Sequence, residues 1–338
     1  MKVLICNEPG RLDYAEREKP VPGPGEALLR VRQAGICGTD LHAFEGTQPY
    51  FSYPRILGHE LAVEFVEVNG PGSWRRGDLL TVMPYFSCGH CVACRRGKPN
   101  CCAQLRVFGV HIDGGLAEYI TVPATALVAA PGLGLDELAL VEPFSVAAHG
   151  IRRAGDLRNA FVLVMGAGPI GLATMEMARL AGARVIALDV DPVRLAFCRQ
   201  VLRVPYCLDG STAPVGSTLA EITRGDMATV VFDATGNLGA IRDGFGYLAH
   251  GGRYVLIGLQ PNDICFSHPE FHKREASLCS SRNALREDFD YVIDCIREGR
   301  IAPVSLVTHR VAFGGLPQAF PGWLRRGSGV IKALVEFS

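Results

Sequence analysis

The segment that begins at Phe161 places the strongest constraint on how this chain folds. FVLVM is an uninterrupted apolar run, GAGPIG follows it, and the next residues have the apolar spacing of a helix. Continuous apolar strands that alternate with helices are typical of a parallel sheet covered on both faces. The alternation continues through RVIALD, PVRLAFCRQVL, TVVFDATG and RYVLIGL. We therefore predict a doubly wound parallel sheet, the Rossmann arrangement, over residues 147–280.

The glycines of GAGPIG predict a dinucleotide site at the start of this sheet. Gly166 permits a tight turn, Gly168 lets the backbone approach a pyrophosphate, and Gly171 allows the helix to pack closely on the strand. Asp189 ends the next strand, where a carboxylate binds ribose hydroxyls and repels a 2′-phosphate. NAD is therefore favoured over NADP. We assign further residues to the same site, namely Pro169, Ile170, Thr235 and Gly258. Arg194 either stacks on the adenine or is an ordinary exposed helical arginine.

The regions on either side of residues 147–280 have a different pattern of apolar residues. Residues 1–146 carry short, alternating runs such as ELAVEFVEV and DLLTVMP that are broken by Gly and Pro, which indicates an antiparallel, barrel-like domain. The tail, residues 281–338, contains an amphipathic helix (EDFDYVIDCIREG) and strand-like runs, and we expect it to return to the first domain. A chain of 338 residues is also longer than one core usually supports.

Composition excludes several classes of function. The formal net charge is zero and no run of like charges stands out, so neither nucleic acid nor an anionic membrane is an expected partner. No apolar stretch is long enough to span a bilayer, and the first residues do not resemble a secretion signal. We expect a cytoplasmic protein that acts on a small molecule.

Five of the twelve cysteines crowd into SCGHCVACRRGKPNCC, which in a reducing compartment favours a metal over disulfides. Four thiolates on one short loop can enclose a zinc ion and exclude substrate, so the signal indicates a structural zinc lobe at about residues 86–103. The ligand candidates are Cys88, Cys91, Cys94 and Cys102, although the spacing alone also allows Cys101 as the fourth.

A second metal-binding constellation lies earlier in the chain. GICGTDLH contains Cys37, Thr39 and His42, and LGHE contains His59 and Glu60. A thiolate, an imidazole and a carboxylate could bind zinc and leave one position open for substrate. Taken singly, each residue also has an ordinary interpretation as a buried thiol, a core histidine or a surface charge.

CGTDLH, GHE, the four-cysteine lobe and GAGPIG, in this order, resemble the zinc-containing medium-chain dehydrogenase/reductase family. The resemblance implies a GroES-like β-barrel catalytic domain built from both chain ends, a Rossmann domain between them, NAD, and two zinc ions per subunit. It implies that Cys37, His59 and Glu60 surround the catalytic zinc, and that Cys102 completes the structural site. VEPFSVAAHG places Glu142 where the primary-alcohol branch has a second cysteine, as in the polyol and threonine branches, either as a direct ligand or as a neighbour of the zinc-bound water.

The resemblance also implies a mechanism and a substrate class. Zinc would act as a Lewis acid on a secondary hydroxyl, NAD would take the hydride, and the proton would leave through Thr39 and His42. TQPYFSYPRILGHE, VFGVHIDGGLAEY and SHPEFHKREASLCSSRNALREDF are similar to bacterial L-galactonate and L-gulonate 5-dehydrogenases. Arg282 and Lys273 are the candidates to bind a sugar-acid carboxylate, although either could be a solvated surface cation.

Three alternatives stay open at this point. A polyol dehydrogenase of the sorbitol or galactitol kind and an L-threonine dehydrogenase share these motifs. A non-catalytic dinucleotide-binding redox sensor is the alternative from a different class. Edge strands of the Rossmann sheet usually pair in this family, which implies a homodimer or homotetramer.

Overall fold

The computed structural model describes residues 1–212, 214–325 and 327–338, and its chain divides into two compact units. Unit 1 comprises Met1–Glu142 and Ala284–Ser338, and unit 2 comprises Pro143–Asn283. Both ends of the chain thus belong to one unit. The boundaries expected from the sequence followed residues 146 and 280.

Unit 1 is built mainly of antiparallel strands. Seven strands form one sheet in the order β10-β6-β5-β3-β18-β17, with β9 also paired to β3, and within it the pair β17-β18 is parallel. The other strands form a three-stranded sheet, β2-β1-β4, and the pair β7-β8. The strands are β1 (Lys2–Glu8), β2 (Arg11–Glu16), β3 (Glu26–Ile36), β4 (Arg55–Ile56), β5 (Glu60–Val68), β6 (Leu79–Val82), β7 (Tyr85–Phe86), β8 (Arg106–Val107), β9 (Tyr119–Pro123), β10 (Leu127–Ala129), β17 (Val307–Ala312) and β18 (Lys332–Glu336). The helices are α1 (Gly38–Glu45), α2 (Val92–Arg95), α9 (Arg286–Arg297) and α10 (Leu316–Trp323).

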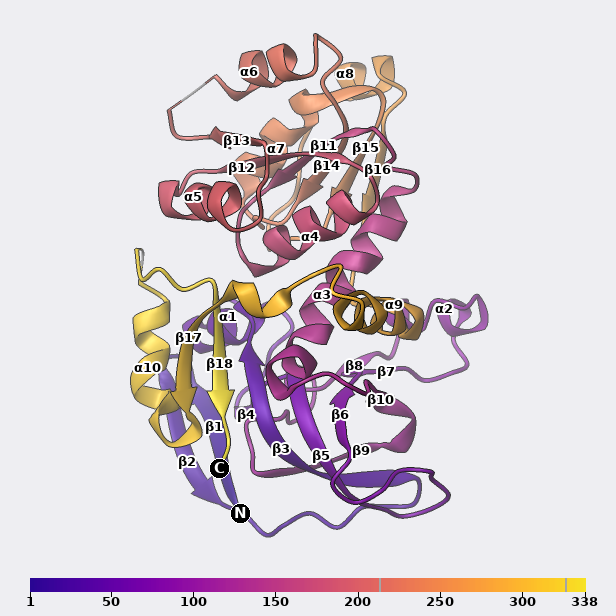
Figure 1. The fold of residues 1–338 in the computed structure, drawn as a ribbon, viewed down its shortest axis with the longest axis vertical. Helices are drawn as coiled ribbons and strands as arrows, with labels where there is room; N and C mark the ends of the chain where they lie inside the picture. Colours follow the sequence, from indigo (N-terminus) through magenta and orange to yellow (C-terminus); the bar gives the residue numbers. More distant parts are fainter. Residues whose placement is uncertain (213, 326) are drawn as a thin grey trace. The chain divides into compact units, whose positions relative to one another are not determined.

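The two chain ends share one hydrophobic core. β18 pairs antiparallel with β3, so the last strand lies beside an early one (Figure 1). On α10, Phe320 is fully buried and its ring packs edge-on against Phe44 of α1. The tail's buried apolar side chains thus belong to a cluster that they share with residues of the first segment, and burial of this cluster joins the two chain ends in one unit.

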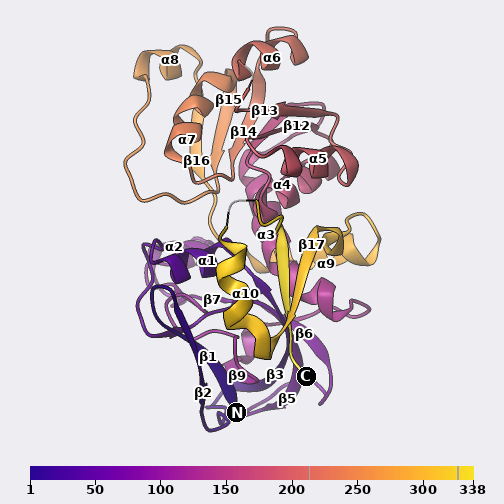
Figure 2. The same ribbon diagram turned by 90° about the vertical axis from the view of Figure 1, so that its left-hand side faces the viewer.

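Unit 2 contains a six-stranded, wholly parallel sheet in the order β13-β12-β11-β14-β15-β16 (Figures 1 and 2). The strands are β11 (Phe161–Met165), β12 (Arg184–Asp189), β13 (Tyr206–Asp209), β14 (Ala228–Asp233), β15 (Leu248–Leu256) and β16 (Ser277–Ser280). The helices are α4 (Pro169–Leu180), α5 (Pro192–Gln200), α6 (Val215–Ile222), α7 (Leu238–Gly244) and α8 (His268–Lys273), and α3 (Leu135–Ala154) crosses the boundary between the units.

In unit 2 the strand order reverses direction between β11 and β14, and ligands of such sheets bind at this switch point, beyond the carboxyl ends of the strands. The sequence prediction found the four inner strands, which are continuous apolar runs. It missed the two edge strands, β13 and β16, because each is only four residues long and neither is a continuous apolar run.

Candidate metal centre and cofactor site

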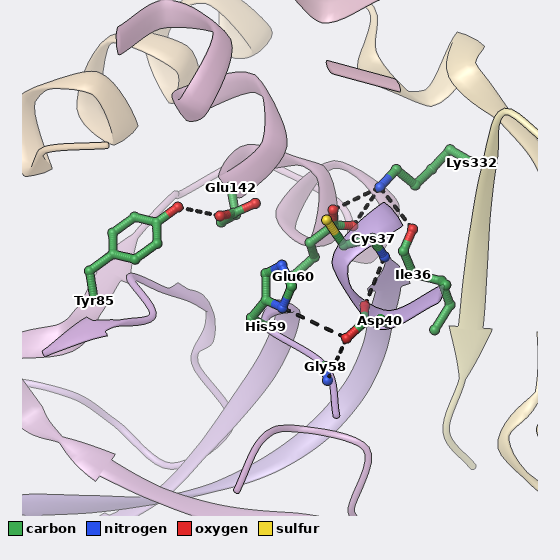
Figure 3. A network of polar contacts seen from close by, with 9 residues as sticks. All are labelled: Ile36, Cys37, Asp40, Gly58, His59, Glu60, Tyr85, Glu142 and Lys332. Carbon is green, nitrogen blue, oxygen red and sulfur yellow. Dashed lines mark hydrogen bonds and ion pairs between the residues drawn. The ribbon is translucent and has the colours of Figure 1, made fainter. Parts of the chain in front are cut away.

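Three candidate ligands converge in unit 1 from neighbouring backbone segments. Cys37 is the residue at which β3 ends and α1 begins, and His59 and Glu60 stand at the start of β5. One ligand atom of each residue lies within 4.8 Å of the others, and the side chains face one another in Figure 3. His59 and Glu60 are buried. The antiparallel pairing of β3 with β5 brings the three residues together, because it sets Gly35 opposite Glu60.

Gly35 leaves the space that the Glu60 side chain occupies. A Cβ at position 35 would overlap Glu60 Oε2 and would lie 3.0 Å from the Glu60 Cβ. No other residue type could stand there without displacing the carboxylate. The close approach of this strand to a functional side chain is a typical reason for a glycine inside a strand.

Lys332 is a buried residue of this group that the sequence reasoning missed. Its Nζ donates to Glu60 Oε1 at 2.7 Å, to Glu60 Oε2 at 2.8 Å and to the Ile36 carbonyl at 3.1 Å (Figure 3). Both side chains of the pair are buried. Burial alone would lower the pKa of Lys332, but the Glu60 charge outweighs it and raises that pKa, so the lysine is an ammonium. The sequence did contain a signal for this buried lysine, because Lys332 stands inside the apolar run IKALVEF.

Asp40 organises the backbone around the same three residues. It is fully buried, its Oδ2 accepts a hydrogen bond from the Cys37 N–H at 2.8 Å, and its Oδ1 accepts one from the Gly58 N–H at 3.1 Å. Its Oδ1 also lies 3.8 Å from His59 Nδ1, which is an ion-pair distance and longer than a hydrogen bond (Figure 3). Burial alone would lower the pKa of His59, but the charges of Asp40 and Cys37 raise it well above its usual value.

Glu142 lies near this group but outside the set of three. It is buried on α3, and its Oε1 accepts a hydrogen bond from the hydroxyl of buried Tyr85. Burial raises the pKa of Glu142, and burial together with the Glu142 charge raises that of Tyr85 well above its usual value. A buried carboxylate facing the centre in this way suits either of the two roles that the sequence left open.

The donor set fits zinc. Sulfur, imidazole nitrogen and carboxylate oxygen are the three ligand types that zinc uses, and three protein ligands leave one position for a small molecule. His59 supplies a further observation, because its buried Nδ1 has no hydrogen-bond partner while its other ring nitrogen faces Cys37. A histidine that binds zinc through one nitrogen normally donates from the other to a carboxylate, and Asp40 is in place for that.

Thr39 and His42, the candidate proton relay, both lie on α1. Thr39 is half-buried in the first turn. His42 is exposed, and its Nδ1 lies 3.3 Å from Glu45 Oε2 and 3.2 Å from Thr47 Oγ1. Helix α1 thus carries Thr39, two residues after Cys37, and the exposed His42, which has Glu45 as an acidic neighbour.

The four cysteines that the family resemblance implies for the structural zinc lie together. The sulfurs of Cys88, Cys91, Cys94 and Cys102 lie within 4.8 Å of one another, whereas Cys101 is exposed and outside this group. The N–H groups of Cys94 and Ala103 lower the pKa of Cys91 to about 6, so the loop amides favour the thiolate that zinc requires. All twelve cysteines are free thiols.

In unit 2 the glycine loop has the geometry that its sequence predicted. Gly166 has a φ of 94°, which favours glycine, and a Cβ at Gly171 would overlap the Gly166 carbonyl. Gly168 is the N-cap of α4, and Pro169 and Ile170 form its first turn. Asp189, at the end of β12, accepts hydrogen bonds from the N–H groups of Ala167 at 2.5 Å and Asp191 at 2.8 Å.

The other residues that the sequence analysis assigned to unit 2 lie at several places around its sheet. Thr235 follows β14 and hydrogen-bonds Asp233, and a Cβ at Gly258 would lie 2.6 Å from Asp233 Oδ2, so both lie at the carboxyl ends of the strands. Arg194 is 3.8 Å from Asp191 and lies beside Gly168. Lys273 lies on α8, before β16, and pairs with Glu270 at 3.1 Å. Arg282 is exposed and follows β16.

Known protein families match segments of both units. The family model of the alcohol dehydrogenase GroES-like domain matches residues 23–132, and that of the zinc-binding dehydrogenase matches residues 169–298. L-galactonate-5-dehydrogenase of Escherichia coli K12 is 40% identical over 100% of this chain and 99% of its own length. Sorbitol dehydrogenase of Halalkalibacterium halodurans is 31% identical over 95% of each.

Solved structures show the same fold over the whole chain. The rspB short chain alcohol dehydrogenase of E. coli CFT073, complexed with the cofactor NADH, has a TM-score of 0.94 and 33% identity, covering 100% of this chain and 99% of its own. In the described part of this chain, no helix is both long and apolar enough to cross a membrane. The family resemblance and the fold class expected from the sequence are therefore confirmed. The chain belongs to the zinc-dependent medium-chain dehydrogenase family, whose alcohol and polyol dehydrogenases are oxidoreductases acting on CH–OH groups.

Proposed function

We propose that this chain oxidises the C5 hydroxyl of a hexonate of the L-galactonate or L-gulonate type to a ketone, with NAD as the oxidant. The cluster of Cys37, His59 and Glu60, with acidic Glu142 beside it, carries the proposal. By the family resemblance, an acidic residue at position 142 separates the polyol and threonine branches from the primary-alcohol branch. The full-length similarity to an L-galactonate-5-dehydrogenase supports the substrate class.

Cys37, His59 and Glu60 would hold the catalytic zinc, and Glu142 would be a fourth ligand or a neighbour of the bound hydroxyl. Zinc supplies a Lewis acid that lowers the pKa of a substrate hydroxyl. Lys332 neutralises and orients Glu60, so the site carries less net negative charge than its thiolate and carboxylates alone would give. Asp40 fixes the Cys37 and Gly58 amides, and it thereby orients two of the candidate ligands.

We propose that the proton of the substrate hydroxyl leaves along α1, from the Thr39 hydroxyl toward His42. Glu45 and Thr47 hold the His42 ring at the solvent-exposed end of this path. Replacing His42 by Ala should therefore slow turnover most at low pH, where solvent hydroxide is scarce, and should leave the zinc content unchanged. A pH–rate profile identical to that of the wild type would refute the relay.

NAD is the proposed cofactor in unit 2. It supplies the hydride acceptor when bound. The N-terminus of α4, at Gly168, would bind the pyrophosphate through its backbone N–H groups. Asp189 would accept hydrogen bonds from the hydroxyls of the adenosine ribose. The Asp189 carboxylate would also repel the 2′-phosphate of NADP.

Arg282 and Lys273 are the two cations proposed for a sugar-acid carboxylate, and Arg282 stands two residues after β16, at the carboxyl ends of the parallel strands. Lys273 already pairs with Glu270, whose charge would oppose a second carboxylate. An Arg282→Ala variant should raise the Michaelis constant for hexonates. An unchanged constant would remove this residue from the proposal.

A homodimer or homotetramer is proposed from the edge of the sheet in unit 2. β16 is an edge strand with Leu278 exposed on it, and an edge of this kind can pair with a second copy of the chain. Light scattering of the purified protein tests the proposal directly.

The decisive experiment measures NAD and NADP reduction side by side with hexonates, hexitols and threonine. We expect the highest kcat/KM with a hexonate and NAD. The similarity to a sorbitol dehydrogenase makes a hexitol the second candidate substrate. A protein that binds two zinc ions but turns over none of these compounds would support a non-catalytic sensor instead.

A further inference from the structure

Tyr85 is the residue that fixes the side chain of Glu142. Its hydroxyl donates a hydrogen bond to Glu142 Oε1 (Figure 3), and in the described part of the chain this is the one donor that the carboxylate has. Tyr85 is 7% exposed and Glu142 is 4% exposed. A carboxylate that is buried in this way needs a donor or a cation in place of the water that it has lost. Tyr85 supplies that donor.

Tyr85 is itself held by both its backbone and its ring. It pairs with Val107 where β7 meets β8, and its ring packs edge-on against Phe289 of α9, with the ring centroids 6.3 Å apart. Phe289 is fully buried. The hydroxyl therefore has a fixed position, and the hydrogen bond sets the orientation of the carboxylate rather than that of the phenol.

Glu142 lies close to the three candidate zinc ligands without belonging to their group. The ligand atoms of Cys37, His59 and Glu60 lie within 4.8 Å of one another, and no oxygen of Glu142 is part of that set. Burial raises the pKa of Glu142 and the charge of His59 lowers it, so the carboxylate is within electrostatic reach of the group. Its hydrogen bond is made to Tyr85 and not to any of the three.

We propose that Tyr85 is a positioning residue that holds the Glu142 carboxylate back from the catalytic zinc. Three protein ligands leave one position for a small molecule, and a carboxylate that moved onto the metal would fill it. Held by Tyr85, Glu142 instead accepts a hydrogen bond from the hydroxyl that enters this position. The inference rests on the zinc site of the proposed function, and it decides between the two roles of Glu142 that the sequence left open.

Tyr85→Phe tests this role because it removes the donor and keeps the ring. The buried carboxylate is then left without its hydrogen bond, and the bound metal ion is the strongest positive charge beside it. We therefore expect Glu142 to turn to the metal and fill the open position. Adding Glu142→Gln removes the charge that would do so. Tyr254→Phe is the matched control, since it removes the hydroxyl of a fully buried tyrosine of unit 2 that donates to the Ile241 carbonyl at 3.1 Å.

The experiment titrates azide into protein in which Co²⁺ replaces zinc, because the visible absorption of Co²⁺ reports its coordination. Azide binds at an open metal position, and a four-cysteine site is closed, so the spectral change reports the other centre. We expect Tyr85→Phe to lower the affinity for azide about tenfold or more, which is the effect of one hydrogen bond to a charged group. Its affinity for the metal, measured by competition with a chelator, should rise. In the Glu142→Gln background the same substitution should change azide binding by less than about threefold. Tyr254→Phe should match the wild type.

Four outcomes would overturn the inference. The first is a Tyr85→Phe protein that binds azide as the wild type does. The second is one that releases its metal more easily, because Glu142 is then a ligand that Tyr85 supports. The third is an equal loss of azide affinity with and without Glu142→Gln, which shows a structural effect. The fourth is a wild type with no azide response, because no position is then open.

These measurements use neither a substrate nor NAD. The substrate assignment is judged separately, on turnover of the wild type with hexonates, hexitols and threonine. A wild type that prefers hexitols refutes the hexonate assignment and leaves the role of Tyr85 to be decided by the azide titration.

Discussion

Removing Lys332 should destabilise unit 1 strongly, because the lysine is the buried counter-ion of Glu60. Both side chains are at most 2% exposed, and Nζ lies 2.7 and 2.8 Å from the two carboxylate oxygens. Breaking a buried pair by deleting one partner costs about 3–5 kcal/mol, since the remaining charge is left without compensation. For a unit of this size, that corresponds to a fall in melting temperature of roughly 6–20 °C.

The measurement is thermal unfolding of Lys332→Met beside the wild type in the same buffer, with both proteins stripped of zinc by a chelator, because a bound zinc ion would itself offset the Glu60 charge. The matched control is Lys273→Met, which removes an exposed lysine paired with Glu270 and should cost less than about 1 kcal/mol. The double variant Lys332→Met with Glu60→Gln should recover much of the lost stability, since it removes the stranded charge as well. If Lys332→Met melts with the wild type, or if the double variant is no better than the single one, the reasoning is refuted.

Gly35→Ala should displace the Glu60 carboxylate and reduce the catalytic zinc content and the turnover at least tenfold. The control Gly322→Ala, on α10 with no atom near its added Cβ, should change neither. A normal zinc content in Gly35→Ala would contradict this prediction. Cys102→Ser should lose one zinc per chain and the stability of the lobe, while exposed Cys101→Ser should keep both ions, and metal analysis of the pair decides between them. Asp189→Ser should reduce the preference for NAD over NADP about tenfold or more, as measured by the ratio of the two kcat/KM values, and an unchanged ratio would contradict the role given to this carboxylate.

Much of the fold could be predicted because it depends on local pattern. The inner strands of unit 2 are continuous apolar runs, and Gly166 and Gly171 stand where the backbone tolerates no side chain. The sequence order of Cys37, His59 and Glu60 also indicated a common site, since their motifs resemble those of a known family. These features lie in short segments, so a single sequence reveals them.

The missed features depend on partners far apart in the chain. Lys332 reaches Glu60 only because β18 pairs with β3 across the full length of the sequence, and no local pattern encodes that register. Tyr85 meets Glu142 for a similar reason. The sequence left two interpretations of Lys273 open, and its exposed ion pair with Glu270, three residues earlier on the same helix, is compatible with a surface cation.

The zinc content of His59→Ala tests the central claim most directly. His59 is one of the three residues whose ligand atoms converge in unit 1, and it lies apart from the four-cysteine lobe. We predict two zinc ions per chain in the wild type, one in His59→Ala, and no NAD-linked oxidation of any polyol by the variant. A variant that keeps both ions, or that turns over a polyol at the wild-type rate, would contradict the account.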